Sequence, residues 1–309
     1  MMASERVFIT GASGMLGAAC CHELREKFEV TGSCLSHTIS LEGAELVRMD
    51  ITNAADAVKK ISAASPALVV HTAALADVDL CETRRALAEK TNRDGAKNVA
   101  IAARECGASL IHMSTDYVFD GAKGMYSETD AVKPLGHYAK TKLAAEREVM
   151  KAYSSAAIVR ATIFGWNVSK ERENLAPKIV RMLRAGERPA LFTDQFSSPL
   201  LVNDLAQIFS EIFARRTPGI LHAGSRGKSS RYMLGDEICS AFGLDKSLLE
   251  GASLEEFRKK GKLKAKRPND TSLNCGKLEA ALGKKMPSLR DCVSEFRDLE
   301  KKGYLQDFK

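Results

Sequence analysis

Residues 6–17, with the sequence RVFITGASGMLG, decide the fold of this chain. The first five residues predict a strand, and a predicted helix follows glycines spaced G-x-x-G-x-x-G. Gly11 lets the chain turn sharply, Gly14 leaves room for a phosphate beside the backbone, and Gly17 lets the helix pack closely on the strand. Because free N–H groups at a helix N-terminus bind anions, the segment predicts a dinucleotide site. The alternative, a glycine-rich turn without a ligand, is weakened by the strand–turn–helix context.

The rest of the first half alternates short apolar runs with helical stretches, as parallel βαβ units do. The run at 67–72 is almost wholly apolar, which predicts a strand buried on both faces. The predicted strands are 6–10, 30–35, 46–49, 67–72, 109–114, 157–162 and 219–223. The predicted helices are 15–27, 54–64, 86–106, 138–153, 175–185, 205–215 and 231–242, followed by a helix-rich tail over 278–302 that is broken at Gly283 and Pro287.

This order of elements predicts an α/β fold, a Rossmann-type doubly wound parallel sheet with a smaller, partly interleaved C-terminal substrate cap. Residues 1–165 are the expected dinucleotide-binding domain, to which residues of about 200–225 return. The cap is expected over 166–199 and 226–309.

Composition narrows the class of protein. The 309 residues are 45% hydrophobic and 28% charged, with a formal net charge of +7, which is typical of a globular domain with anionic ligands. No apolar stretch is long enough to span a membrane, and no signal peptide is evident, so a cytoplasmic location is expected by default. The lysine-rich stretch 259–267 has neither interleaved aromatics nor a nucleic-acid motif, which favours a solvated surface. Eight cysteines without a C-x-x-C pair or a histidine cluster predict reduced, mostly buried thiols and no metal.

A second local pattern carries chemistry. Tyr138 and Lys142 are four residues apart, so they share one face of a predicted helix. A phenol has a pKa near ~10, and a neighbouring ammonium lowers that pKa. Ser114 and Thr115, at the end of the predicted strand 109–114, would place a hydroxyl at the carboxyl edge of the sheet, where it could stabilise a developing alkoxide. Hydroxyl, phenol and ammonium together predict carbonyl reduction.

These motifs resemble the extended short-chain dehydrogenase/reductases and, among them, the dTDP-4-dehydrorhamnose reductase family. The resemblance runs essentially from end to end of the chain. It is carried by TGASGMLG (10–17), HTAALADVD (71–79), Asn92, STDYVFDG (114–121), YSETDAVKPLGHYAKTK (126–142), DQFSSP (194–199), GILHAGS (219–225) and KRPNDTSLN (266–274).

The resemblance implies NADPH-dependent reduction of a 4-keto-deoxysugar nucleotide, as in dTDP-L-rhamnose synthesis, and it allows a homodimer. Tyr138 would donate the proton, Lys142 would bind the ribose and tune Tyr138, Thr115 would contact the keto group, and Asp116 would lie near the sugar. The expected cofactor residues are Gly11, Gly14, Met15, Leu16 and Gly17 on the pyrophosphate, Asp50 and Ile51 beside adenine, Ala73, Ala74 and Leu75 along the cofactor strand, and Tyr138 and Lys142 at the nicotinamide.

The choice of dinucleotide depends on the end of the second predicted strand. An acidic residue there would bind the ribose of NAD, but the segment 32–37 has none. Ser36 and His37 could accept a 2′-phosphate, so NADPH is expected, with NADH as an alternative. Asp50 is equally compatible with a simple turn carboxylate.

Three features leave alternatives open. Asn92 is expected to be structural or to lie in a proton path. The family often has a tryptophan in the substrate pocket after the strand ending near Arg160, and this stretch of the chain is one residue shorter than the usual pattern. Phe164 or Trp166 would either substitute for that tryptophan or be a core or rim aromatic. Arg267 would face the substrate or form a surface ion pair.

Two other functions are compatible with the sequence. An epimerase or reductase acting on another nucleotide sugar would share these motifs. A non-catalytic regulatory protein resembling the beta subunit of methionine adenosyltransferase would keep the dinucleotide fold. The intact Thr115, Tyr138 and Lys142 favour catalysis.

Overall fold

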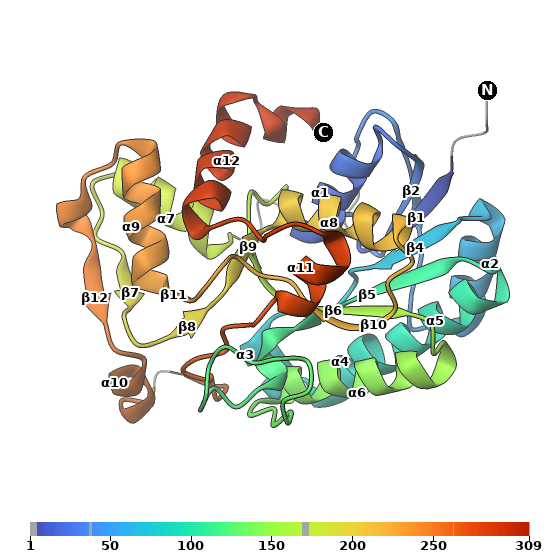
Figure 1. Ribbon diagram of the computed structural model, residues 1–309, viewed down its shortest axis with the longest axis horizontal. Helices are drawn as coiled ribbons and strands as arrows, with labels where there is room; N and C mark the ends of the chain where they lie inside the picture. The colour runs from blue at the N-terminus through green and yellow to red at the C-terminus, as the bar shows by residue number, and fades with distance from the viewer. Residues whose placement is uncertain (1–4, 37–38, 169–172, 262, 309) are drawn as a thin grey trace.

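The computed structural model describes residues 5–36, 39–168, 173–261 and 263–308. A parallel sheet with the strand order β10-β6-β5-β4-β1-β2-β3 forms its centre, and β9 also pairs with β6 (Figure 1). The strands of this sheet are β1 (Arg6–Thr10), β2 (Glu29–Cys34), β3 (Ala44–Arg48), β4 (Leu68–His71), β5 (Ser109–Thr115), β6 (Ala157–Phe164), β9 (Pro199–Leu201) and β10 (Gly219–His222). The order reverses between β1 and β4, which is the switch point of a doubly wound sheet. The predicted fold class is therefore confirmed.

Helices cover both faces of the sheet, with α1 and α8 on one face and α2, α5 and α6 on the other (Figure 1). Alternating residues of β1 show why both faces need cover: Val7 and Ile9 belong to the core under α1, and Phe8 belongs to the core under α2. The helices around the sheet are α1 (Met15–Leu24), α2 (Ala54–Ala64), α3 (Val78–Thr83), α4 (Arg85–Ala88), α5 (Gly95–Glu105), α6 (His137–Ala152) and α8 (Val202–Ala214).

The helix predicted over 86–106 is interrupted. A π-helical segment, η1 (Glu89–Asp94), joins α4 to α5. Such segments insert one extra residue per turn and redirect side chains, and Asn92 lies within this one. Gly107 follows α5 with a φ of +73°, as a helix-ending glycine should.

Most of the remaining elements form a smaller part beside the carboxyl edge of the sheet, whereas the C-terminal turn 304–307 packs against α1 (Figure 1). Two pairs of short strands lie here, β7 with β12 and β8 with β11. Strand signals did not predict these pairs, because segments of two or three residues have no periodicity. The elements are α7 (Leu175–Arg184), β7 (Ala190–Phe192), β8 (Phe196–Ser197), β11 (Ser229–Ser230), α9 (Arg231–Phe242), η3 (Lys246–Leu248), β12 (Glu250–Ala252), α10 (Leu254–Lys259), α11 (Gly276–Leu282), α12 (Leu289–Lys301) and η4 (Tyr304–Asp307), with η2 (Asp116–Val118) following β5.

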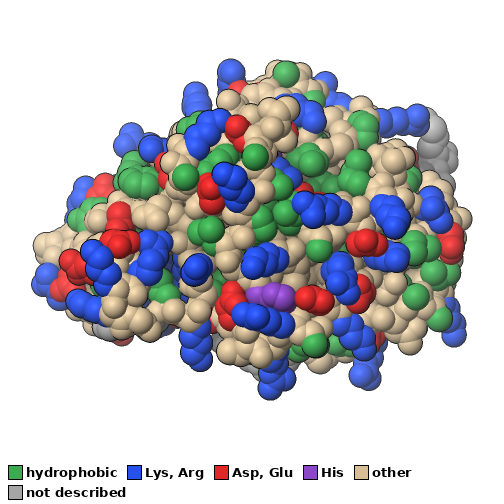
Figure 2. All heavy atoms as spheres, turned by 90° about the horizontal axis from the view of Figure 1, so that it is seen from below, with side chains coloured by type: hydrophobic (Ala, Val, Ile, Leu, Met, Phe, Trp, Pro, Cys, Tyr) green, Lys and Arg blue, Asp and Glu red, His purple; other side chains and the backbone are tan. Residues whose placement is uncertain are grey.

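The surface over α4 and α6 is highly charged. Figure 2 shows lysine, arginine and acidic side chains interspersed across this face. Several form exposed ion pairs, such as Arg93 with Glu89 and Lys97 with Glu148. Such pairs are worth little energy, so this face is a solvated surface. No helix in the described part of the chain is long and apolar enough to cross a bilayer.

Candidate active site

The glycine turn between β1 and α1 is closely packed. Gly11 has a φ of +73°, and a Cβ there would lie 2.8 Å from the Ala73 backbone. A Cβ on Gly17 would overlap the Gly11 carbonyl. At Gly14 an added Cβ would meet only the Gly11 oxygen, at 3.2 Å. Gly11 and Gly17 are therefore required by packing, and Gly14 is the least crowded of the three glycines.

The N-terminus of α1 fits the phosphates of a dinucleotide. Gly14 is its N-cap, and no side chain caps the helix. The N–H of Gly14 is bonded to the Gly11 oxygen at 2.9 Å, whereas the first N–H groups of α1 have no partner within the helix. Leu16 is buried and Met15 is partly buried against the core, so these residues would contact a phosphate through their backbone.

Two further residues predicted to contact the cofactor follow β3. The Asp50 carboxylate accepts a hydrogen bond from the Thr52 N–H at 2.9 Å, as a turn carboxylate does, and its contact with adenine stays a prediction. Ile51 is buried, and its carbonyl accepts from Asn98 at 3.0 Å. Ser36 is exposed beyond β2, and His37 lies outside the described residues.

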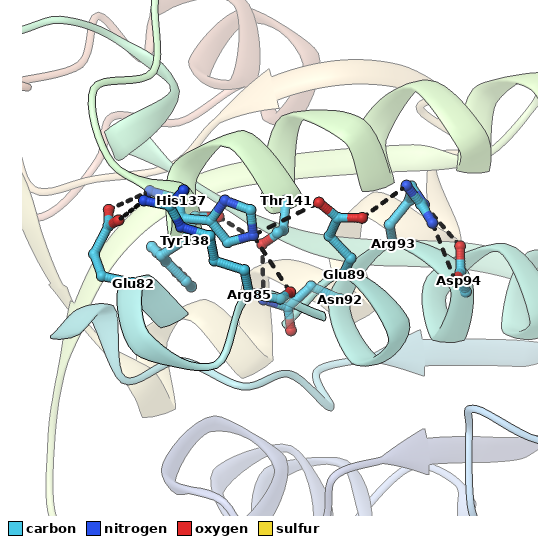
Figure 3. Close-up of polar contacts among 9 residues, drawn as sticks. All are labelled: Glu82, Arg85, Glu89, Asn92, Arg93, Asp94, His137, Tyr138 and Thr141. Carbon is cyan, nitrogen blue, oxygen red and sulfur yellow. Dashed lines mark hydrogen bonds and ion pairs between the residues drawn. The ribbon is translucent and has the colours of Figure 1, made fainter. Parts of the chain in front are cut away.

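The segment after β4 is held by Asn92. Ala73, Ala74 and Leu75 are partly buried there. The Leu75 N–H donates to the Asn92 carboxamide oxygen at 2.8 Å, and the Asn92 amide donates to the Leu75 carbonyl at 3.1 Å. The same amide donates to the Thr141 hydroxyl at 2.9 Å (Figure 3). Asn92 is 1% exposed. Asn92 therefore joins the segment 73–75, which is predicted to contact the cofactor, to α6. This is a structural role.

Glu82 caps the helix that carries Tyr138 and Lys142, a role that sequence patterns did not indicate. Its carboxylate accepts the His137 N–H at 2.6 Å and pairs with Arg85 at 3.3 Å (Figure 3). The hydrogen bond from the His137 backbone lowers the pKa of Glu82. The cap is 55 residues from the helix in sequence, whereas capping motifs are recognised from adjacent residues.

Thr115 and Tyr138 come together at the carboxyl end of β5. The Thr115 hydroxyl is buried, accepts the Tyr117 N–H at 3.2 Å, and faces the Tyr138 phenol. Burial raises the pKa of Tyr138 above its ordinary value, while the Thr115 hydroxyl acts in the opposite direction. The sequence predicted a lowered pKa; burial raises the pKa instead and keeps the phenol protonated.

Lys142 is 3% exposed, and its ammonium donates to the Met113 carbonyl at 2.6 Å. Burial lowers the pKa of Lys142 to about 8. The side chain therefore carries a charge that titrates close to neutral pH, at the same strand end as Thr115.

Asp116 lies behind this cluster and beside an open pocket. It is 2% exposed and accepts hydrogen bonds from the Thr115 and Thr271 hydroxyls. Burial raises its pKa.

The pocket has a volume of about 210 Å³ and lies between the strand ends and the smaller part of the chain. Its polar lining includes Tyr117, Thr162, Gln195 and Arg231. Gln195 donates to the Tyr117 hydroxyl at 3.3 Å, and its buried carbonyl oxygen has no partner. An acceptor buried without a donor is costly, so this atom is suited to bind a ligand hydroxyl or N–H.

Trp166 and Arg267, whose roles the sequence left undecided, make structural contacts. Trp166 stacks on Phe296 at 4.3 Å and donates its indole N–H to the Phe296 carbonyl, which makes it a core aromatic. Phe164 is 2% exposed and lines one wall of the pocket. Arg267 pairs with Asp79 at 2.9 Å, which joins the segment after α10 to α3.

Among the described residues, no group of three or more histidine, cysteine, aspartate or glutamate side chains is placed to hold a metal ion. The cysteines are free, and seven of the eight are buried.

Comparisons with known proteins show the family to which the chain belongs. Residues 5–301 match the family model described as the RmlD substrate binding domain. The dTDP-4-dehydrorhamnose reductase of Mycobacterium tuberculosis is 34% identical over 265 residues, which are 82% of this chain and 81% of that protein. Methionine adenosyltransferase 2 subunit beta of Mus musculus is 29% identical over 292 residues, 92% of this chain and 85% of that protein.

A solved structure extends the likeness to the cofactor. The crystal structure of dTDP-4-dehydrorhamnose reductase from Bacillus anthracis in complex with NADP has a TM-score of 0.84 and 28% sequence identity, and the match covers 96% of this chain and 99% of that chain. The predicted cofactor class agrees with the NADP in that structure. The chain therefore belongs to the RmlD substrate binding domain family, within the extended short-chain dehydrogenase/reductases.

Proposed function

We propose that the chain is an NADPH-dependent reductase of a 4-keto-deoxysugar nucleotide, with dTDP-4-dehydrorhamnose as the first candidate substrate. The proposal depends on the Thr115 hydroxyl and the Tyr138 phenol, which come together one helical turn from the buried Lys142. The uncapped N-terminus of α1 supports dinucleotide binding at the same edge of the sheet. Residues 1–165 with about 200–225 would form the cofactor domain, an assignment supported by the pairing of β10 with β6.

Bound NADPH would supply the hydride to the keto carbon. Tyr138, kept protonated by burial, would donate its proton to the carbonyl oxygen as negative charge develops there. The Thr115 hydroxyl would hold that oxygen by a hydrogen bond. Lys142 would bind the ribose hydroxyls and stabilise the phenolate left on Tyr138.

The pocket beside Asp116 is the proposed sugar-nucleotide site. Its volume of about 210 Å³ adjoins the catalytic strand end through Tyr117 and Thr271. Arg231 contributes a cation to its lining, which suits the diphosphate of a nucleotide sugar. Gln195 offers its unpartnered oxygen to a donor on the substrate.

The test is NADPH oxidation by the purified chain against a panel of 4-keto-deoxysugar nucleotides that includes dTDP-4-dehydrorhamnose, with NADH in parallel. The proposal expects stoichiometric NADPH consumption with at least one of these substrates. An epimerase would interconvert sugars without net NADPH consumption. Retained NADPH binding with no turnover on any member would overturn the reductase proposal.

The similarity to methionine adenosyltransferase 2 subunit beta supports a second candidate, a regulatory subunit. That function predicts a stable complex with a methionine adenosyltransferase and a changed activity of that enzyme. Size-exclusion chromatography of the mixed proteins distinguishes it from the reductase.

A further inference from the structure

A buried ion pair lies next to the proposed catalytic cluster, which consists of Thr115, Tyr138 and Lys142. The proposed reaction uses neither member of this pair. The side chains of Glu146 and Arg160 are each 3% exposed. Arg160 donates from Nε to one carboxylate oxygen at 2.9 Å and from Nη2 to the other at 2.6 Å. Such a bidentate pair fixes the geometry of both side chains. Because a buried ion pair often contributes no more stability than apolar side chains of equal volume, its presence here points to another role.

The carboxylate of Glu146 also joins the catalytic helix to the catalytic strand. Ser114 on β5 donates its hydroxyl to Glu146 at 2.5 Å. The preceding strand residue, Met113, accepts the Lys142 ammonium at 2.6 Å. Two consecutive strand residues are therefore bonded to two α6 residues that are one turn apart. Thr115, the next residue of the strand, is the one that meets Tyr138.

We infer that Glu146 is the positioning residue of this site: held by Arg160 and Ser114, it fixes α6 against the end of β5 and places a negative charge one turn from Lys142. This inference rests on the proposed reductase function for its kinetic consequences. Its binding consequences rest only on the proposed contact of Lys142 with NADPH.

The charges around Lys142 agree with this role. Burial lowers the pKa of Lys142 to about 8, and Glu146 acts in the opposite direction. His71 on β4 and His112 on β5 also face the ammonium; burial lowers the pKa of both, that of His71 to about 3, so they are neutral. Tyr138 on the same helix is protonated, and the cation of Arg160 is paired with the Glu146 carboxylate. Glu146 is therefore the group that favours the charged form of Lys142.

The test compares Glu146→Gln with Glu23→Gln. Glu23 is a matched carboxylate at the far end of α1, 15% exposed, which accepts hydrogen bonds from Asn203 and Gln207. Glu146→Gln should move the alkaline limb of kcat/KM to lower pH by about half a unit to one unit and weaken NADPH binding several-fold at pH 8, measured by fluorescence titration. Glu23→Gln should lower the melting temperature while leaving both properties unchanged.

If kcat/KM of Glu146→Gln falls at the same alkaline pH as in the wild type, and if NADPH binds with wild-type affinity, the inference is wrong. If that variant does not fold, Glu146→Met combined with Arg160→Met removes both charges and keeps the volume. The double variant should fold yet bind NADPH more weakly, and wild-type affinity and kcat in it would equally refute the role. If the wild-type chain reduces no keto sugar, the reductase proposal is wrong, but the fluorescence titration of NADPH still tests the role of Glu146. The two failures are therefore distinguishable.

Discussion

The glycine turn and the catalytic cluster lie at the same edge of one sheet but are built in different ways. The turn consists of neighbours in sequence, and what it offers a ligand is backbone N–H groups at the start of α1. The cluster consists of side chains from β5 and α6, held by contacts from further elements. A backbone site depends on the space that its glycines leave. A side-chain site depends on the register of the elements that carry it.

The largest expected effect comes from a change in the catalytic cluster that leaves the glycine turn intact. Tyr138→Phe removes the proposed proton donor and should lower kcat by about 10²- to 10⁴-fold, while the NADPH dissociation constant stays nearly unchanged because the turn is intact. Steady-state kinetics and fluorescence titration measure the two quantities. Tyr153→Phe, which loses a hydrogen bond to the Ala108 carbonyl at the other end of the same helix, is the control and should keep wild-type kcat. A wild-type rate in Tyr138→Phe would refute the mechanism.

The reciprocal change acts on the turn. Gly14→Val places a side chain in the open space beside the Gly11 carbonyl, where a phosphate would lie. We expect NADPH affinity to fall by at least about tenfold, which corresponds to about 1.4 kcal/mol of binding free energy. Circular dichroism should show a retained fold. Unchanged affinity in a folded variant would mean that the dinucleotide does not use this turn.

The pH dependence sharpens the description of the cluster. The pKa of Lys142 is lowered to about 8, so the side chain is an ammonium below that pH and neutral above it. If the ammonium is required, kcat/KM should be constant below about pH 8 and fall by up to about tenfold per unit above it. A profile of kcat/KM between pH 6 and 10 measures this. A rate that stays constant throughout this range would show that the charge of Lys142 is not needed.

The smallest effect concerns the contact between the two parts of the chain. Asp79→Asn weakens the ion pair with Arg267, whose side chains are 37% and 19% exposed. We expect a loss of about 0–1 kcal/mol in the free energy of unfolding, measured by urea denaturation. Glu250→Gln, which breaks the exposed pair with Arg188, is the control. A loss well above that range would make the pair a principal tie between α3 and the segment after α10.

The long elements were predictable because their signals are local. The strand 6–10 and the helices 54–64 and 231–242 agree with the structure residue for residue, since apolar periodicity, capping residues and glycine positions all lie within the segment itself. The continuous helix predicted over 86–106 was wrong in its middle. The π-helical turn around Asn92 accompanies hydrogen bonds to Leu75 and Thr141, and those partners are distant in sequence.

The sequence by itself determined the family, the fold class, the glycine turn and the spacing of Tyr138 and Lys142, because each depends on residues close together along the chain. Only the tertiary structure decided that Glu82 caps α6, that burial raises the pKa of Tyr138, and that Glu146 joins α6 to β5 and β6. Burial and hydrogen bonding are properties of the packed chain, in which partners tens of residues apart become neighbours. No periodicity or motif records them.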